Sequence, residues 1–169
     1  MILDFNFHNP TKIYFGKTAL DNLSAELANY GENVLFMYGK SAIKKIGLFD
    51  KVIKILKESG KNVIELEGIK PNPSYSQVLL GSRLVRENNV DLILAVGGGS
   101  TIDCAKAISV SAYCEGDPWE KYWINSEEVT NKIVPVGSIL TMAGTASEMN
   151  GGSSKYFATL GSVKIVSLS

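Results

Sequence analysis

A strand that runs directly into three consecutive glycines constrains this chain more than any other feature. Residues 91–96 are an aspartate followed by five apolar residues, Gly97, Gly98 and Gly99 come next, and a helical repeat opens at Ser100. Glycines remove every Cβ from the turn, so main-chain N–H groups can reach a bound anion, and the helix dipole adds partial positive charge there. The run predicts a phosphate or pyrophosphate cradle at the carboxyl end of a strand. The alternative is a tight strand-to-helix connection, which needs one glycine rather than three.

Short apolar runs alternate with helical repeats along most of the chain. We expect strands at residues 2–7, 12–15, 34–38, 63–66, 92–96 and 133–136, and helices at residues 17–30, 49–59, 74–88 and 100–112. Strands that alternate with helices of this length imply βαβ units and right-handed crossovers. The predicted fold is therefore α/β, with a Rossmann-like parallel sheet covered by helices on both faces.

Three further expectations complete this layout. The first two strands should lie near a sheet edge. Val78, Leu79, Leu84 and Val85 should face the core from the helix that Ser74 caps. Residues 119–123, which include two tryptophans and a tyrosine, should form an aromatic loop over the sheet. Residues 1–153 then form one dinucleotide-binding domain, and residues 154–169 form a divergent tail.

Charge and composition exclude several classes of partner. The 17 Lys and Arg residues balance 17 Asp and Glu residues among 169, so there is no electrostatic case for binding nucleic acid or an anionic membrane. No basic start with an apolar run and no stretch of membrane-spanning length occurs, and we expect a cytoplasmic protein. Cys104 and Cys114 lack metal-ligand spacing and should be reduced. His8 is the one histidine, and its place on an expected edge strand gives it no role.

A second cluster of small residues follows the last expected strand. Residues 141–148 contain Thr141, Thr145 and Ser147, whose hydroxyls suit contacts with ribose and phosphate. The alternative is a helix start with Thr145 or Ser147 as its N-cap. No Gly-x-Gly-x-x-Gly fingerprint opens a helix and no P-loop occurs. No tyrosine precedes a lysine by four positions, which disfavours a short-chain dehydrogenase.

The end of the strand at residues 34–38 bears on the choice between NAD and NADP. An acidic residue at such a position hydrogen-bonds the ribose 2′-hydroxyl and repels a 2′-phosphate. Here the strand ends in Tyr38, Gly39, Lys40 and Ser41, without a carboxylate. Either this turn accepts a 2′-phosphate, which favours NADP slightly, or it is a solvated turn with a surface lysine.

Four motifs in one order resemble a known family. They are residues 5–13, Pro71-Asn72-Pro73, Gly97 to Ser100 with Asp103, and Gly144 to Glu148. The chain resembles the iron-containing (group III) alcohol dehydrogenases, particularly the NAD(P)H-dependent butanol dehydrogenases and aldehyde reductases. The resemblance extends from the N-terminus to about Ser153.

The resemblance implies an N-terminal dinucleotide-binding domain, followed in the family by a helical domain that binds Fe²⁺ or Zn²⁺ and that this chain does not contain. Hydride passes between the nicotinamide and a small primary alcohol or aldehyde. Carried over by position, the implied cofactor residues are Gly97, Gly98, Gly99 and Ser100 at the pyrophosphate, Asp103, Thr141 and Thr145 along the nucleotide and nicotinamide, Gly39 and Ser41 around the adenosine ribose, and Asn72 facing the cofactor. Lys106 is expected to pack or pair near its helix.

Two departures from the family pattern limit what the resemblance carries. Met142 stands where the family often has a threonine, and the tail beyond Ser153 does not continue the pattern. A premature end, a shifted reading frame or a partial copy of a longer protein would each leave such a tail. We therefore expect no catalytic or metal-binding residue in this chain and expect a homo-oligomer or self-association through exposed apolar surface. The alternative is a non-catalytic remnant that binds nucleotide or only folds.

Overall fold

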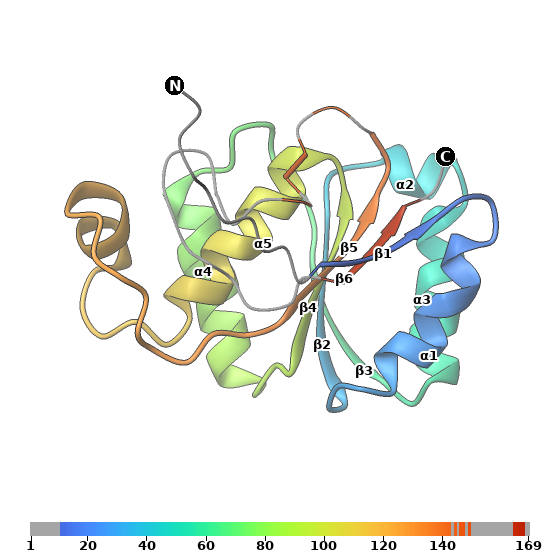
Figure 1. Ribbon diagram of the computed structural model, residues 1–169, viewed down its shortest axis with the longest axis horizontal. Helices are drawn as coiled ribbons and strands as arrows, with labels where there is room; N and C mark the ends of the chain where they lie inside the picture. Colours follow the sequence, from blue (N-terminus) through green and yellow to red (C-terminus); the bar gives the residue numbers. More distant parts are fainter. Residues whose placement is uncertain (1–10, 143, 145, 148, 150–163, 168–169) are drawn as a thin grey trace, which may run out of the picture.

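The chain folds around one parallel sheet with helices on both of its faces (Figure 1). The computed structural model describes residues 11–142, 144, 146, 147, 149 and 164–167. The strands are β1 (Lys12–Phe15), β2 (Asn33–Tyr38), β3 (Asn62–Leu66), β4 (Leu92–Gly97), β5 (Val136–Leu140) and β6 (Lys164–Ser167). The helices are η1 (Ala19–Asn22), α1 (Leu23–Leu27), α2 (Ala42–Lys45), α3 (Leu48–Glu58), α4 (Tyr75–Glu87), α5 (Gly99–Ser111) and η2 (Trp119–Ile124). This arrangement confirms the predicted Rossmann-like α/β fold.

The strand order is β1-β6-β5-β4-β2-β3, and every neighbouring pair is parallel. From β2 the chain moves outward to β3, crosses back to β4 on the other side of β2, and continues outward to β5. The direction of winding therefore reverses between β2 and β4. In open α/β sheets, ligands bind at the carboxyl ends of the strands beside such a reversal, which is where β4 runs into the glycine turn.

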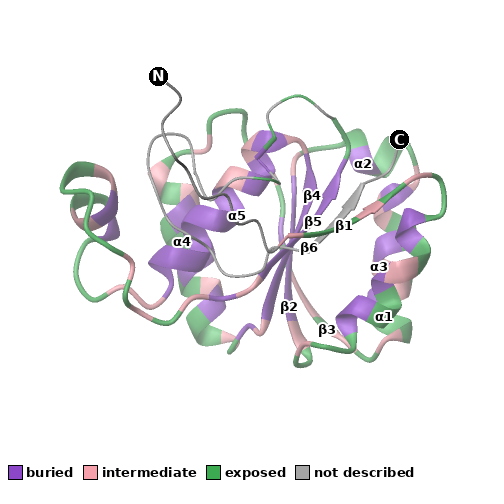
Figure 2. Ribbon diagram, in the orientation of Figure 1, coloured by how far each residue is buried: buried purple, intermediate pink, exposed green. Residues whose placement is uncertain are grey.

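Helices α1 and α3 cover one face of the sheet, and α4 and α5 cover the other (Figure 1). Successive side chains of β2 alternate between them: Leu35 and Met37 pack toward α4 and α5, whereas Val34, Phe36 and Tyr38 pack toward α1 and α3. Strands β2 and β4 are buried along nearly their whole length (Figure 2). Burial on both faces explains their continuous apolar sequences.

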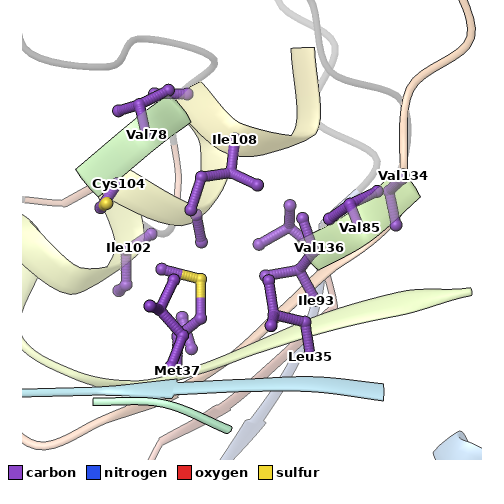
Figure 3. Close-up of a cluster of buried hydrophobic side chains, with 14 of the residues drawn as sticks. Leu35, Met37, Val78, Val85, Ile93, Ile102, Cys104, Ile108, Val134 and Val136 are labelled. Carbon is purple, nitrogen blue, oxygen red and sulfur yellow. The ribbon is translucent and has the colours of Figure 1, made fainter. Parts of the chain in front are cut away.

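The core beneath α4 and α5 is packed at close range. Ile102, Cys104 and Ile108 of α5 lie over Met37 and Ile93 of the sheet (Figure 3). Gly81 of α4 faces Ile108, and a Cβ at residue 81 would lie 2.2 Å from its Cδ1 atom. The two helices approach closely because this position carries no side chain.

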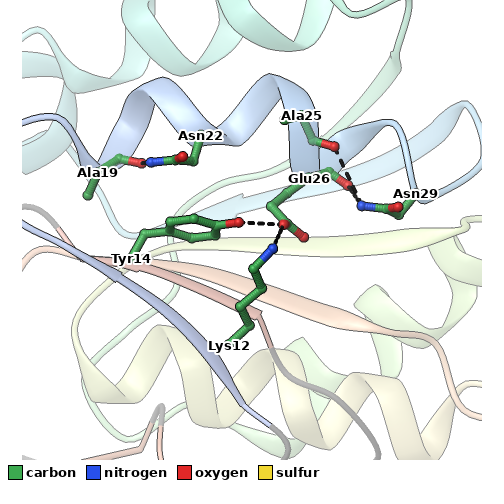
Figure 4. Close-up of polar contacts among 7 residues, drawn as sticks. All are labelled: Lys12, Tyr14, Ala19, Asn22, Ala25, Glu26 and Asn29. Carbon is green, nitrogen blue, oxygen red and sulfur yellow. Dashed lines mark hydrogen bonds and ion pairs between the residues drawn. The ribbon is translucent and has the colours of Figure 1, made fainter.

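An ion pair fastens the edge strand β1 to α1 (Figure 4). Glu26 of α1 is buried, and its Oε1 atom accepts hydrogen bonds from Lys12 Nζ at 2.5 Å and from Tyr14 Oη at 2.6 Å. The carboxylate raises the pKa of Lys12 well above its usual value. The expected strand at residues 12–15 is confirmed as the sheet edge, and the expected strand at residues 2–7 lies outside the described residues.

Two expected elements have different bounds. The helix expected at residues 17–30 is a 3₁₀ turn, η1, followed by the short helix α1. The strand expected at residues 133–136 begins at Val136 instead. Pro135 has no N–H to donate to a ladder, and only its carbonyl pairs, accepting from the Ile93 N–H at 2.9 Å.

Two predictions about side-chain placement are wrong. Leu79 was expected in the core but is 43% exposed, because α4 turns Gly81 toward Ile108 of α5 and buries Val78, Gly81, Ser82 and Val85 instead. The aromatic segment does not cover the sheet: it forms η2, which lies beyond α4 (Figure 1). The centre of the Trp119 ring lies 5.5 Å from that of Tyr75 and, in a stacked arrangement, 5.8 Å from that of Trp123. Ser74 does begin α4, as expected, in a capping box with Gln77.

Part of the expected tail belongs to the sheet. Residues 164–167 form β6, which pairs with β5 on one side and with β1 on the other. Without β6, β1 would have no neighbour in this sheet. The division of the chain at residue 153 stays a prediction.

Candidate functional site

The glycine turn joins β4 to α5 at the carboxyl edge of the sheet. Gly97 ends β4, Gly98 is the N-cap of α5, and Gly99 is its first residue, so the helix begins one residue before the position expected. The Gly98 carbonyl accepts from the N–H groups of Thr101 and Ile102 at 3.0 and 3.3 Å. The first two N–H groups of the helix, those of Gly99 and Ser100, lie before this pattern of bonds. They are placed to bond an anion, aided by the dipole of a 13-residue helix.

Gly97 and Gly98 differ in what surrounds them. A Cβ at residue 97 would lie 2.6 Å from Thr101 Oγ1, so a side chain there would force Thr101 to shift. A Cβ at residue 98 would meet only Met142 Cβ, at an ordinary 3.8 Å, and the Gly98 backbone has φ −91° and ψ −172°, which any residue adopts. Packing within the described chain thus explains the first glycine but not the second.

The segment after β5 lies beside this turn. The Thr141 N–H donates to the Gly97 carbonyl at 3.0 Å, and the exposed side chains of Thr141 and Met142 follow. The structure therefore places Thr141 beside the glycine turn, and its predicted role at the nucleotide stays a prediction. Thr145 lies outside the described residues.

A buried lysine links α5 to the same segment. Lys106 is 1% exposed, and its Nζ atom lies 3.1 Å from Asp103 Oδ1 and donates to the Ser147 carbonyl at 3.0 Å. The expectation that Lys106 pairs near its helix is confirmed. Asp103 lies one turn from Gly99, and the pairing with Lys106 restrains its carboxylate. Its predicted role at the nucleotide stays a prediction.

The carboxyl end of β2 lies on the other side of the winding reversal. The Gly39 carbonyl accepts from the Gly68 N–H at 3.1 Å, and the Tyr38 carbonyl accepts from the Ile69 N–H at 3.2 Å. These bonds tie the turn after β2 to the turn after β3. Ser41 is exposed at the N-cap of α2. Gly39 and Ser41 therefore follow β2, the strand next to β4. Their predicted place at the adenosine ribose stays a prediction.

A cluster of charges stands at this end of β2 that the sequence did not predict. The Tyr38 hydroxyl donates to Glu65 Oε2 at 2.7 Å and to Glu67 Oε2 at 3.2 Å, and Lys44 Nζ of α2 lies 3.1 Å from Glu67 Oε2. Lys44 also lies 5.1 Å from the centre of the Phe49 ring. The alternation of Glu65 and Glu67 in the strand sequence places both on one face, but only the pairing of β2 with β3 brings them to Tyr38.

Asn72 is separated from the glycine turn in sequence and has an unusual backbone. It is exposed, with φ +52°, in the segment between β3 and α4. Asparagine tolerates this left-handed conformation better than most residues. Its predicted role at the cofactor stays a prediction.

A cleft of about 610 Å³ opens between η1 and α3 and reaches Thr141. Apolar side chains and lysines both line it: Leu20, Ile46, Leu48, Ile55, Lys17, Lys51 and Lys54, with Asp21 and Glu58. The volume falls within the range of small-molecule sites. It can take an organic group larger than a phosphate next to the residue that bonds the glycine turn.

The part of the chain that the structure describes contains no cluster of possible metal ligands. No three His, Cys, Asp or Glu side chains come together there as a metal site would require. Burial raises the pKa of the Cys104 thiol to about 12, with a smaller contribution from Asp103, which keeps the thiol protonated and unsuited to bind a metal. His8 lies outside the described residues. In the same described residues, no helix has the length and apolar character needed to cross a bilayer.

The chain is similar in sequence to several dehydrogenases. It is 49% identical over 148 residues to the probable NADH-dependent butanol dehydrogenase 2 of Bacillus subtilis, covering 87% of this chain and 37% of that protein. It is 42% identical over 151 residues to the NADPH-dependent aldehyde reductase YqhD of Escherichia coli, covering 88% of this chain and 38% of that protein. The chain therefore spans less than two fifths of the length of these relatives.

Solved structures and a family model agree with these relatives. The NADH-dependent butanol dehydrogenase A of Thermotoga maritima superposes with a TM-score of 0.83 at 36% identity, over 96% of this chain and 44% of that one. The family model described as iron-containing alcohol dehydrogenase matches residues 10–167. That match continues beyond Ser153 to residue 167, and the predicted divergence of the tail stays a prediction. By sequence and by fold, the chain belongs to the iron-containing alcohol dehydrogenase family.

Proposed function

We propose that this chain is the nucleotide-binding portion of an NAD(P)H-dependent, metal-dependent alcohol dehydrogenase that interconverts small primary alcohols and aldehydes. Gly98 carries the proposal. It leaves space above the N-terminus of α5 that no described side chain fills, although neither its backbone angles nor its neighbours require a glycine. A pyrophosphate fits that space, because the amides of Gly99 and Ser100 and the helix dipole converge on it.

Other residues would have supporting roles. Thr141 would contact the nucleotide beside the turn, Gly39 and Ser41 would surround the adenosine ribose, and Asp103 would line the nicotinamide side in the orientation that Lys106 fixes. The names of the relatives, butanol dehydrogenase and aldehyde reductase, support a small alcohol or aldehyde as substrate. The family's iron or zinc does not fit the residues described, so we assign no step to a metal here.

Nucleotide titration tests the proposal. The purified chain should bind NADH and NADPH, followed by quenching of Trp fluorescence or by calorimetry, with dissociation constants within about tenfold of each other, or 1.4 kcal/mol. The turn after β2 favours NADPH slightly, since it carries Lys40 and Ser41 without a carboxylate of its own.

Substitutions at Gly98 locate the site. Gly98→Ala and Gly98→Val should weaken both nucleotides at least about tenfold, since a side chain occupies the phosphate position. The Cβ has room in the protein, so Gly98→Ala should change the free energy of unfolding by only about 1 kcal/mol or less. Unchanged affinity in both variants would remove the site from the turn. A well-folded chain that binds neither nucleotide would favour the alternative, a remnant that only folds.

A further inference from the structure

The ion pair between Lys44 and Glu67 stands beside the turn that follows β2. Lys44 Nζ lies 3.1 Å from Glu67 Oε2. Glu67 immediately precedes Gly68, whose N–H donates to the Gly39 carbonyl at 3.1 Å. The pair is therefore within a few residue lengths of Gly39, on the strand next to the glycine turn.

The ion pair between Lys44 and Glu67 is exposed, so it adds little to the stability of the fold. The side chain of Lys44 is 46% exposed and that of Glu67 is 67% exposed, and exposed ion pairs contribute little to folding. The Lys44 ammonium, with help from the Tyr38 hydroxyl, holds the pKa of Glu67 below its usual value. Glu67 therefore carries its full negative charge at neutral pH.

Charge near the carboxyl end of β2 bears on the adenosine ribose of a bound dinucleotide. The carboxyl end of the strand next to a glycine turn is where NAD and NADP are distinguished, because only NADP carries a 2′-phosphate on its adenosine ribose. Lys40 and Lys44 supply positive charge there, Glu65 accepts a hydrogen bond from Tyr38 nearby, and Glu67 pairs directly with Lys44. The sequence of the β2 turn, read alone, lacks this carboxylate, because it comes from the turn after β3.

We propose that Glu67 is a specificity-determining residue for the nucleotide: by neutralising Lys44 beside the end of β2, its carboxylate disfavours the 2′-phosphate of NADPH relative to the 2′-hydroxyl of NADH. This inference rests on the proposed function. It assigns the selectivity to a residue in the turn after β3, which the hydrogen bond from the Gly68 N–H to the Gly39 carbonyl joins to the turn after β2.

The experiment measures the ratio of the NADH and NADPH dissociation constants in the full 169-residue chain. Glu67→Gln keeps the shape of the side chain and an acceptor for Tyr38 but removes the charge, so it should shift the ratio toward NADPH about threefold or more at 20 mM salt. Lys44→Met removes the cation that faces Glu67 and should shift the ratio the opposite way by a similar factor. The double variant should return close to the starting ratio.

Salt and a remote charge provide the controls. At 0.5 M salt the shifts should shrink, since the Debye length falls to a few ångströms, whereas a structural change at the site would persist. Glu87→Gln makes the same change in net charge at the exposed C-terminal end of α4, which leads into the amino end of β4, and should leave the ratio unchanged.

Each outcome decides between two claims. A shift of the ratio in Glu67→Gln that Glu87→Gln lacks and that salt suppresses supports the role of Glu67. NADH binding that is retained with an unchanged ratio overturns this inference and leaves the proposed function intact. Failure of the unsubstituted chain to bind either nucleotide overturns the proposed function, and the inference with it.

Discussion

At the scale of single residues, the two glycines at the β4–α5 junction have different physical reasons. Gly97 cannot be replaced without moving Thr101, because a Cβ would lie 2.6 Å from its hydroxyl oxygen. Loss of binding in a Gly97 variant would therefore mix damage to the fold with damage to the site. Gly98 has room for a Cβ, so its variants report on the ligand, and this contrast makes the titration above interpretable.

Cys104 gives a prediction about pH. Burial raises its pKa from 9.0 to about 12, so the thiol stays protonated in the folded chain while the unfolded chain ionises above pH 9. Between about pH 9 and 12 the folded state binds more protons than the unfolded state, and the contribution of this group makes stability fall as pH rises. At pH 8, Ellman's reagent should label the partly exposed Cys114 first and Cys104 only after denaturation. Equal labelling rates would contradict the burial of Cys104.

Lys106 gives a prediction about stability. Lys106→Met keeps most of the volume but removes the ammonium that bonds Asp103 and the Ser147 carbonyl. We expect the free energy of unfolding to fall by about 2–4 kcal/mol, since breaking a buried ion pair leaves polar groups desolvated. Lys54→Met is the matched control, because that lysine is 72% exposed in its pair with Glu58 and should cost about 0.5 kcal/mol or less. Similar urea midpoints for the two variants would show that the bonds of Lys106 to Asp103 and to the Ser147 carbonyl do not stabilise the fold.

At the scale of elements, the contact between α4 and α5 depends on Gly81. Replacing glycine by alanine in an exposed helix stabilises it by about 1 kcal/mol. Here the added Cβ would lie 2.2 Å from Ile108 Cδ1, so Gly81→Ala should instead destabilise the chain by about 1–3 kcal/mol. In the background of Ile108→Ala, which removes that atom, the same substitution should become stabilising. Measured by urea denaturation, the same sign in both backgrounds would mean that the helices are not in contact at Gly81.

At the scale of the whole molecule, the residues available for metal chemistry limit what this chain does alone. Its sequence contains one histidine, whereas a catalytic zinc or iron site requires three or four convergent ligands. We expect the purified 169-residue chain to show no butanal-dependent oxidation of NADPH, with or without added Fe²⁺ or Zn²⁺. A full-length family dehydrogenase is the positive control. Turnover near about 1 s⁻¹, or one tightly bound metal per chain in metal analysis, would contradict this expectation.

Local patterns in the sequence determined the elements of this protein. The apolar runs of β2 and β4, the helical repeat of α3, the capping residue Ser74 and the glycine turn at residues 97–99 all appear in the structure within a few residues of their predicted places. Each leaves a mark within a short stretch of sequence, such as the period of a buried face or the polar N-cap of a helix. Such marks can be read without knowing which elements meet.

Only the tertiary structure decided which elements meet and what they place together. The strand order puts β2 between β4 and β3, and that order brings Glu67 to Lys44 and Tyr38, so a turn without a carboxylate in sequence has one in space. The later start of β5, the outward turn of Leu79 and the insertion of β6 beside β1 were equally absent from the local pattern. The physical reason is that strands pair and helices rotate so as to bury apolar surface against other elements. The best arrangement depends on all of those elements together and cannot be read from one segment.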